Sequence, residues 1–119
     1  DVSITLEAQE ESLKLEANQQ QEVFRIIQEA LNNVIKHAHA ETALVSLDCY
    51  EEMLRVIISD NGRGFDTQTP VQNQFHFGLE SMRQRARELG GTLEIKAAPG
   101  SGTKVICIIP IKEDPATHG

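Results

Sequence analysis

The chain has 119 residues, of which 39% are hydrophobic and 24% are charged, and its formal net charge is −7 at pH 7. This length suits one domain with a modest core, and the acidic balance argues against a sequence-independent nucleic-acid binder. The sequence has no apolar run of about 20 residues that would span a membrane. Cys49 and Cys107 lack metal-type spacing and lie in apolar runs, so we expect two buried free thiols in a reducing compartment.

The first half of the chain predicts a strand, a helix and a second strand. Residues 2–6 alternate in polarity and indicate an opening edge strand, whereas residues 7–18 are acidic and show no clear period. A helix is expected over residues 21–38, because apolar residues recur there every three or four positions. Residues 43–50 are again typical of a strand.

The polar face of the expected helix carries four functional candidates: Glu29, Asn33, Lys36 and His37. Residues three or four positions apart project from one side of a helix, so Glu29, Asn33 and one of the two basic side chains should form a column. Carboxylate and amide oxygens suit Mg²⁺ or its waters, and the basic groups could reach phosphate oxygens. A solvated polar face is the alternative interpretation.

A further strand is expected over residues 53–59, where branched apolar residues dominate, and it ends at Asp60. Asn-Gly is a turn signal, and Gly62 and Gly64 would let the backbone pass close to a ligand. The Asp60 carboxylate could accept a hydrogen bond from an exocyclic amine such as adenine N6. For this peptide alone, a hairpin turn explains the residues equally well.

A long polar loop is expected over residues 66–77, and loops of this length are often lids or disordered segments. A helix with one apolar face should follow from Gly78 and end at the glycine pair at 90–91. Free amide groups at its start, together with the helix dipole, would favour an anion such as phosphate. Three arginines of this helix could add positive charge there, but each is expected to face solvent: Arg83, Arg85 and Arg87.

Two final strands are expected over residues 92–97 and 104–109, joined by a tight hairpin. Thr103 lies at the start of the last strand and could face the ligand, whereas residues 112–119 are typical of a disordered tail. The predicted elements give an α/β (α+β) two-layer sandwich, in which helices cover one face of a mixed, mainly antiparallel sheet.

The first two of four ordered motifs resemble the N box and G1 box of the GHKL superfamily of ATP-binding domains. That superfamily includes type II topoisomerases, a heat-shock chaperone, histidine kinases and mismatch-repair ATPases. Residues 29–37 resemble the N box, with Asn33 at the Mg²⁺-ligand position. Residues 60–64 resemble the G1 box, with Asp60 at the adenine-reading position.

The other two motifs complete the resemblance. Gly78-Leu79 resembles a reduced G2 box at the end of the ATP lid, and residues 100–103 resemble the final glycine-threonine motif. The resemblance covers roughly residues 21–110 and implies the Bergerat-type ATP-binding fold.

The helix after the lid indicates which members of the superfamily the chain resembles. Gly78-Leu79-x-x-Met82-x-x-Arg85-Ala86, followed by Leu89-Gly90-Gly91, is similar to bacterial sensor histidine kinases. The short lid and the N box that starts at Glu29 are similar to the subfamily of nitrate/nitrite sensors and membrane-fluidity sensors. Most other histidine kinases have an asparagine where Glu29 stands. Whether Glu29 acts as a base or only positions Mg²⁺ waters stays open.

The resemblance implies the catalytic domain of a two-component sensor histidine kinase, which binds Mg-ATP and donates the γ-phosphoryl group to a histidine on a separate dimerisation domain. Glu29 and Asn33 would be catalytic, with Asn33 binding Mg²⁺ directly and Glu29 acting either as a base or on Mg²⁺ through water. The phosphate would then pass to a response regulator. The residues implied to contact the nucleotide are Asn33, Lys36, His37, Asp60, Gly62, Gly64, Gly78, Leu79 and Thr103.

None of the four histidines lies in the helical acceptor motif of such kinases. Residues 1–111, with a core over 19–110, are therefore expected to be a catalytic domain whose dimerisation and phosphoacceptor domain lies elsewhere in a longer receptor. That parent is expected to be a homodimer that can be membrane-bound, with this domain in the cytoplasm. Two alternatives remain: a GHKL serine kinase of the anti-sigma type, and a non-catalytic nucleotide-binding module.

Overall fold

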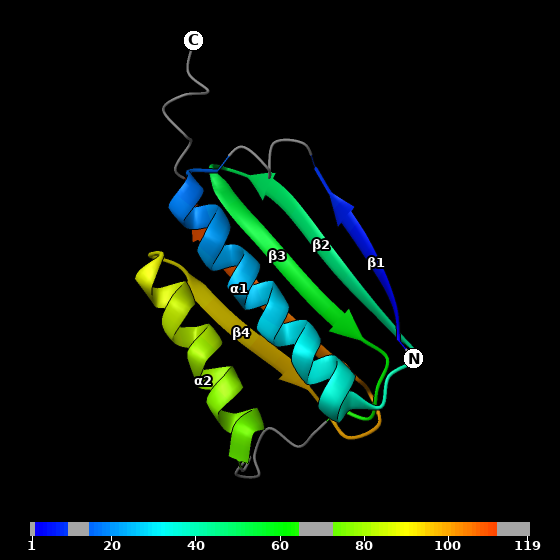
Figure 1. Ribbon diagram of the computed structural model, residues 1–119. Helices are drawn as coiled ribbons and strands as arrows, with labels where there is room; N and C mark the ends of the chain where they lie inside the picture. The colour runs from blue at the N-terminus through cyan, green and yellow to red at the C-terminus, as the bar shows by residue number, and fades with distance from the viewer. Residues whose placement is uncertain (1, 10–14, 65–72, 112–119) are drawn as a thin grey trace.

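A mixed sheet covered on one face by two helices forms the framework (Figure 1). The computed structural model describes residues 2–9, 15–64 and 73–111. The strands, in the sheet order β1-β2-β3-β5-β4, are β1 (Ser3–Ala8), β2 (Thr42–Tyr50), β3 (Met53–Asp60), β5 (Thr103–Pro110) and β4 (Thr92–Ala97). The helical elements are α1 (Ala17–Asn33), the π-helical turn η2 (Val34–Ala38) and α2 (Asn73–Glu88).

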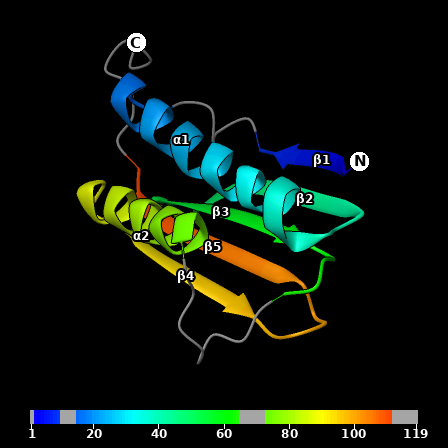
Figure 2. The ribbon, with the colours of Figure 1, turned by 60° about the horizontal axis from the view of Figure 1, so that its bottom comes forward.

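The sheet is mainly antiparallel, as the sequence predicts. β3 pairs antiparallel with both β2 and β5, and β4 pairs antiparallel with β5. β1 pairs parallel with β2 at one edge. Figure 2 shows α1 and α2 side by side on the same face, which confirms the two-layer sandwich.

The core lies where alternate residues of the sheet meet the apolar faces of the two helices. In β3, Leu54, Val56 and Ile58 are buried while the residues between them are half-buried, as expected for a strand with one covered face. The expected apolar face of α2 is confirmed, because Leu79, Met82 and Ala86 are buried against the same cluster. Burial of this shared surface is the main force that holds the two layers together.

Helix α1 starts four residues before the predicted helix over 21–38, and the last part of the predicted range is a π-helical turn. It begins at Ala17, where the side chain of Gln19 is buried and its Nε2 donates a hydrogen bond to the Pro110 carbonyl at 2.9 Å. Its last five residues form the π-helical turn η2 instead of continuing as α-helix. His39 then ends the element in the left-handed conformation, with φ 52°.

Helix α2 begins at Asn73, so residues 73–77 are helical and do not belong to the loop that the sequence predicts. Its other end agrees with the prediction. The Gly91 N–H donates to the Ala86 carbonyl and the Gly90 N–H to the Arg87 carbonyl, each at 2.9 Å, which is the Schellman pattern. Residues 66–72 of the predicted lid over 66–77, and the predicted disordered tail over 112–119, lie outside the described residues.

The two cysteines are free, but only one is buried. Cys107 lies in the core, and burial raises the pKa of its thiol to about 11. Cys49 is half-buried, so the prediction of burial is wrong for this residue. Among the described residues, no helix is long and apolar enough to cross a membrane.

Candidate nucleotide and metal site

The two predicted catalytic side chains, Glu29 and Asn33, meet at one place on α2. They are four residues apart on α1, so they lie one turn apart on the same side of the helix. A Cβ atom placed on Gly78 would overlap Glu29 Oε1 and would lie 3.4 Å from Asn33 Nδ2. The predicted column is therefore confirmed for these two residues, and it faces α2.

Gly78 has a different structural setting from the predicted one. It is the sixth residue of α2, beyond the first four positions at which a helix has free N–H groups. The predicted anion site at a helix start is therefore wrong for Gly78. Its missing side chain lets α2 approach Glu29 closely. The neighbouring Leu79, also a predicted nucleotide contact, packs in the hydrophobic core.

The Asn33 amide nitrogen has no partner among the residues that the structure describes. This Nδ2 atom is buried, and an unpaired buried polar group costs about 1–3 kcal/mol. An amide can donate to a phosphate oxygen through nitrogen and can bind Mg²⁺ through oxygen. The Asn33 amide and the neighbouring Glu29 carboxylate are therefore chemically suited to a nucleotide that carries Mg²⁺.

The metal would depend on this amide and on oxygens that are not protein side chains. In the described part of the chain, no group of three or more His, Cys, Asp and Glu side chains could hold a metal ion. Mg²⁺ commonly keeps several waters and binds through one or two protein groups together with substrate phosphates. The composition of the site agrees with that mode of binding.

Asp60 and Thr103 form the second part of the site. They are directly paired in the register of β3 and β5, which places their side chains next to each other on the same face of the sheet. Asp60 follows the buried Ile58 by two positions, so this face is the one covered by the helices. Asp60 Oδ1 accepts a hydrogen bond from the Gly62 N–H at 2.7 Å. A carboxylate has further acceptor sites for a base amine.

The glycines after Asp60 pass close to the protein's own backbone. A Cβ atom on Gly62 would overlap the Ala38 carbonyl, and one on Gly64, whose φ is +63°, would overlap the Ala98 carbonyl. The Arg63 N–H also donates to the Ala38 carbonyl at 2.8 Å. The loop therefore fastens the end of η2 to the end of β3, which brings the two halves of the site together. A contact of Gly62 and Gly64 with a nucleotide stays a prediction.

Asn61 is a positioning residue that the sequence analysis missed. Its Oδ1 accepts hydrogen bonds from the N–H groups of Glu41 and Thr42, both at 2.9 Å. These bonds attach the Asp60 loop to the segment that enters β2. Asn in an Asn-Gly pair was visible as a turn signal, but its partners are about 20 residues away in the sequence.

The two basic candidates lie on the π-helical turn. Lys36 is exposed, and the side chain of His37 lies outside the described part of the structure. A π-helical turn changes the angular spacing of the residues that it contains, so α-helical spacing does not place these groups beside Asn33. Such turns occur frequently at functional sites. Phosphate contacts by Lys36 and His37 stay predictions.

The three arginines of α2 all have partners. Arg83 pairs with Glu80 at 2.8 Å, and an Arg87 Nη2 donates to the Gln84 side chain at 2.9 Å. Arg85 Nη1 instead pairs with Glu22 on α1, also at 2.9 Å. The prediction that Arg85 faces solvent is wrong, because it joins the two helices.

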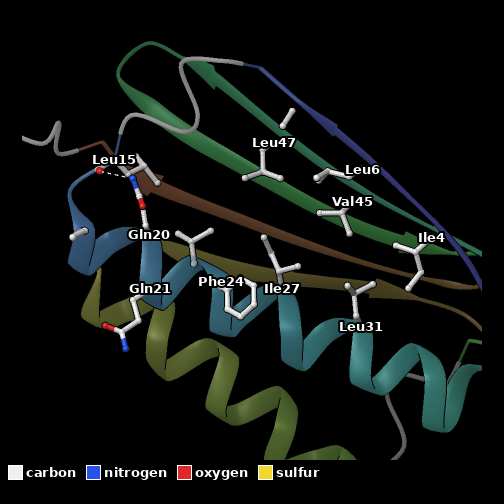
Figure 3. A pocket seen from close by; sticks show the side chains of 13 residues that line it. Ile4, Leu6, Leu15, Gln20, Gln21, Phe24, Ile27, Leu31, Val45 and Leu47 are labelled. Carbon is white, nitrogen blue, oxygen red and sulfur yellow. Dashed lines mark hydrogen bonds between the residues drawn. The ribbon is translucent and has the colours of Figure 1, made fainter. Parts of the chain in front are cut away.

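An apolar groove lies on the side of α1 away from α2. It has a volume of about 770 Å³ and runs between α1 and the strands β1 and β2. Figure 3 shows Phe24, Ile27 and Leu31 of the helix facing Ile4 and Leu6 of β1. None of the described residues that line it is charged, and their apolar side chains do not suit a nucleotide. The predicted site lies on the opposite side of α1.

Comparison with known proteins decides the family. The family described as "histidine kinase-, DNA gyrase B-, and HSP90-like ATPase" matches residues 18–113. The chain belongs to this family. Asn33, Asp60 and Thr103 all lie within the matched region.

Several relatives of the chain are named sensor kinases. It is 36% identical over 105 residues to the sensor protein VraS of Staphylococcus saprophyticus, covering 87% of this chain and 30% of that protein. It is 39% identical over 89 residues to the sensor histidine kinase LiaS of Bacillus subtilis, covering 75% and 24%. The chain therefore spans only about a quarter to a third of these relatives.

Solved structures show the same fold. A blue-light activated histidine kinase of Erythrobacter litoralis superposes with a TM-score of 0.78 at 21% identity, over 92% of this chain and 35% of that chain. The mycobacterial sensor histidine kinase MprB gives a TM-score of 0.72 at 17% identity, over 94% and 83%. The predicted fold class is confirmed by these likenesses.

Proposed function

We propose that the chain is the catalytic ATP-binding domain of a two-component sensor histidine kinase. In this role it would bind Mg-ATP and donate the γ-phosphoryl group to a histidine on a separate dimerisation domain. The observation that carries the proposal is the buried Asn33 Nδ2 atom, which has no hydrogen-bond partner among the described residues and lies beside the Glu29 carboxylate. Membership of an ATPase family whose similar members include sensor histidine kinases supports it.

The residues divide into groups for the base and for the phosphates. Asp60 would accept a hydrogen bond from the adenine amine, and its strand partner Thr103 would assist through water. Asn33 would hold Mg²⁺ through its amide oxygen, with the Glu29 carboxylate beside it. When bound, the metal would neutralise charge on the phosphates. Lys36 would contact phosphate oxygens from the exposed side of η2.

The remaining contacts would come from His37 and from the main chain at Gly62 and Gly64. Gly78 would serve the site by letting α2 lie against Glu29, and Leu79 by packing α2 on the core. Phosphoryl transfer asks a protein mainly for positioning and electrostatic stabilisation, which agrees with a site that needs no protein nucleophile of its own. Glu29 would act on the attacking imidazole as a base or through the Mg²⁺ waters.

The parent protein supplies the rest of the reaction. We propose that residues 1–111 form the catalytic domain of a homodimeric receptor that can be membrane-bound, with this domain on the cytoplasmic side. Its partners would be its own phosphoacceptor domain and a response regulator. We also propose the subfamily of nitrate/nitrite and membrane-fluidity sensors, on the N box that starts at Glu29.

Autophosphorylation of the full-length parent with labelled ATP tests this function. Asn33→Ala should reduce phosphohistidine formation about 10²–10³-fold, a loss typical of removing one preorganised polar group from a catalytic site. Asn32→Ala is the matched control, because Asn32 lies next to Asn33 on α1 but is exposed. Acid-stable phosphoserine on a partner would instead indicate the serine kinase, and nucleotide binding without any transfer would indicate the non-catalytic module.

A further inference from the structure

Among the contacts between the described residues of α1 and α2, two have the same spacing on both helices. Glu22 pairs with Arg85 at 2.9 Å, and Glu29 lies against Gly78. Glu29 follows Glu22 by seven residues on α1, and Arg85 follows Gly78 by seven residues on α2. Seven residues are two helical turns, or about 10.5 Å. Figure 1 shows the helices running antiparallel, so both contacts belong to one interhelical register.

This register decides what faces the Glu29 carboxylate. Gly78 is the only residue of α2 without a side chain, and even a Cβ atom at this position would overlap Glu29 Oε1. A shift of α2 by one turn, about 5.4 Å, could bring the side chain of Met82 to the same place. The same shift would separate Arg85 from Glu22, because an ion pair at hydrogen-bond distance does not survive a displacement of several ångström.

The Glu22–Arg85 pair is suited to holding this register. Its two side chains are 21% and 31% exposed, compared with 47% and 39% for Glu80 and Arg83. The shielded pair is therefore screened less by solvent. The Glu80–Arg83 pair joins two residues of α2 and cannot fix α2 against α1. Arg25, on α1, lies 3.9 Å from Glu22 and adds positive charge beside the same carboxylate.

We propose that Arg85 is a positioning residue of the ATP site. It fixes the axial position of α2 through Glu22, so that Gly78 stands opposite Glu29 and the Asn33 amide. Arg85 acts through the helix and does not touch a phosphate. The proposal rests on the proposed function in so far as this site binds Mg-ATP, but the register itself exists in the absence of nucleotide.

Arg85→Gln tests the proposal, with Arg83→Gln as the matched control on the same helix. Calorimetric titration with Mg-ATP should show about tenfold weaker binding for Arg85→Gln and a change within about twofold for Arg83→Gln. The charge-swapped double variant, Glu22→Arg with Arg85→Glu, should recover most of the affinity. The core variant Ile109→Val controls for a general loss of stability. At a Tm similar to that of Arg85→Gln, it should bind Mg-ATP as tightly as the unaltered chain does. Unchanged affinity in Arg85→Gln, or no recovery in a folded double variant, would overturn the proposal.

A nucleotide-free measurement separates this proposal from the proposed function. In ¹H–¹⁵N spectra, the side-chain NH₂ resonances of Asn33 should move in Arg85→Gln, return in the double variant and stay in place in Arg83→Gln. If the unaltered chain binds no Mg-ATP, the proposed function fails, and these resonances still decide whether Arg85 sets the register. If the Asn33 resonances do not respond to Arg85→Gln, Arg85 does not fix the position of α2 and the proposal is refuted.

Discussion

Replacing Gly78 with alanine is the sharpest test of the contact between α2 and the side chains of Glu29 and Asn33. Alanine is favoured over glycine inside a helix by about 0.8–1 kcal/mol, so the substitution should stabilise α2 by that amount if space allows. The added Cβ atom would overlap Glu29 Oε1, however. That oxygen is at the end of a flexible side chain, so we expect Glu29 to swing away and the helices to stay together.

The expected magnitude follows from these two terms. Forcing a side chain off its rotamer costs about 0.5–1.5 kcal/mol, which nearly cancels the gain in helix propensity. Gly78→Ala should therefore change the free energy of unfolding by less than about 1 kcal/mol. In a Glu29→Ala background the overlap is gone, and Gly78→Ala should give the full gain of about 0.8–1 kcal/mol. The coupling energy between the two positions is then about 0.5–1.5 kcal/mol.

Urea unfolding of the four chains in this cycle measures the coupling energy. The comparison is valid where the m-value is the same in all four. Mg-ATP affinity should also fall in Gly78→Ala, because Glu29 no longer stands beside Asn33. Equal stabilisation by Gly78→Ala in both backgrounds would refute the reasoning, since Glu29 would then not occupy the space next to Gly78.

Three further predictions concern the core and the thiols. Ile26→Ala should lower the free energy of unfolding by about 2–5 kcal/mol, because Ile26 is 0% exposed, whereas Phe24→Ala should cost much less, because Phe24 is 62% exposed; equal losses in urea titrations would contradict this. Maleimide at pH 7.5 should modify the half-buried Cys49 before the buried Cys107, as followed by mass spectrometry. Because burial raises the pKa of Cys107 from 9.0 to about 11, the unfolded chain loses this proton first, and the free energy of unfolding should fall from about pH 9 to pH 11 by up to about 2–3 kcal/mol. Cys107→Ala should lack this part of the fall, and an identical pH profile would contradict the assignment.

The strands and the core could be predicted because their signal is local. In β3, alternation of Leu54, Val56 and Ile58 with less buried residues is a property of a single strand that packs on one face. The spacing of Glu29 and Asn33 is likewise set by one helix. The spacing of apolar residues within one helix or strand predicts burial correctly when that whole apolar face packs in the core.

The parts that could not be predicted depend on contacts far apart in the sequence. Residues 73–77 are polar or aromatic and give no helical period alone, yet they extend α2. The π-helical turn η2 ends where the Ala38 carbonyl accepts the Arg63 N–H. Arg85 and Glu22 are 63 residues apart, and each looks like an ordinary surface charge in its own helix. The pairing of Asp60 with Thr103 agrees with the family resemblance, but no local pattern fixes it.

Calorimetric titration of the chain with ATP, with and without Mg²⁺, tests the central claim most directly. We expect Mg²⁺-dependent binding that is abolished in Asp60→Asn and loses its metal dependence in Asn33→Ala. In the proposed site Asp60 reads the base, and the buried Asn33 Nδ2 atom has no partner among the described residues. Asn32→Ala should bind as the unaltered chain does. ATP affinity that is the same in all of these chains, or that is independent of Mg²⁺ in the unaltered one, would contradict the account.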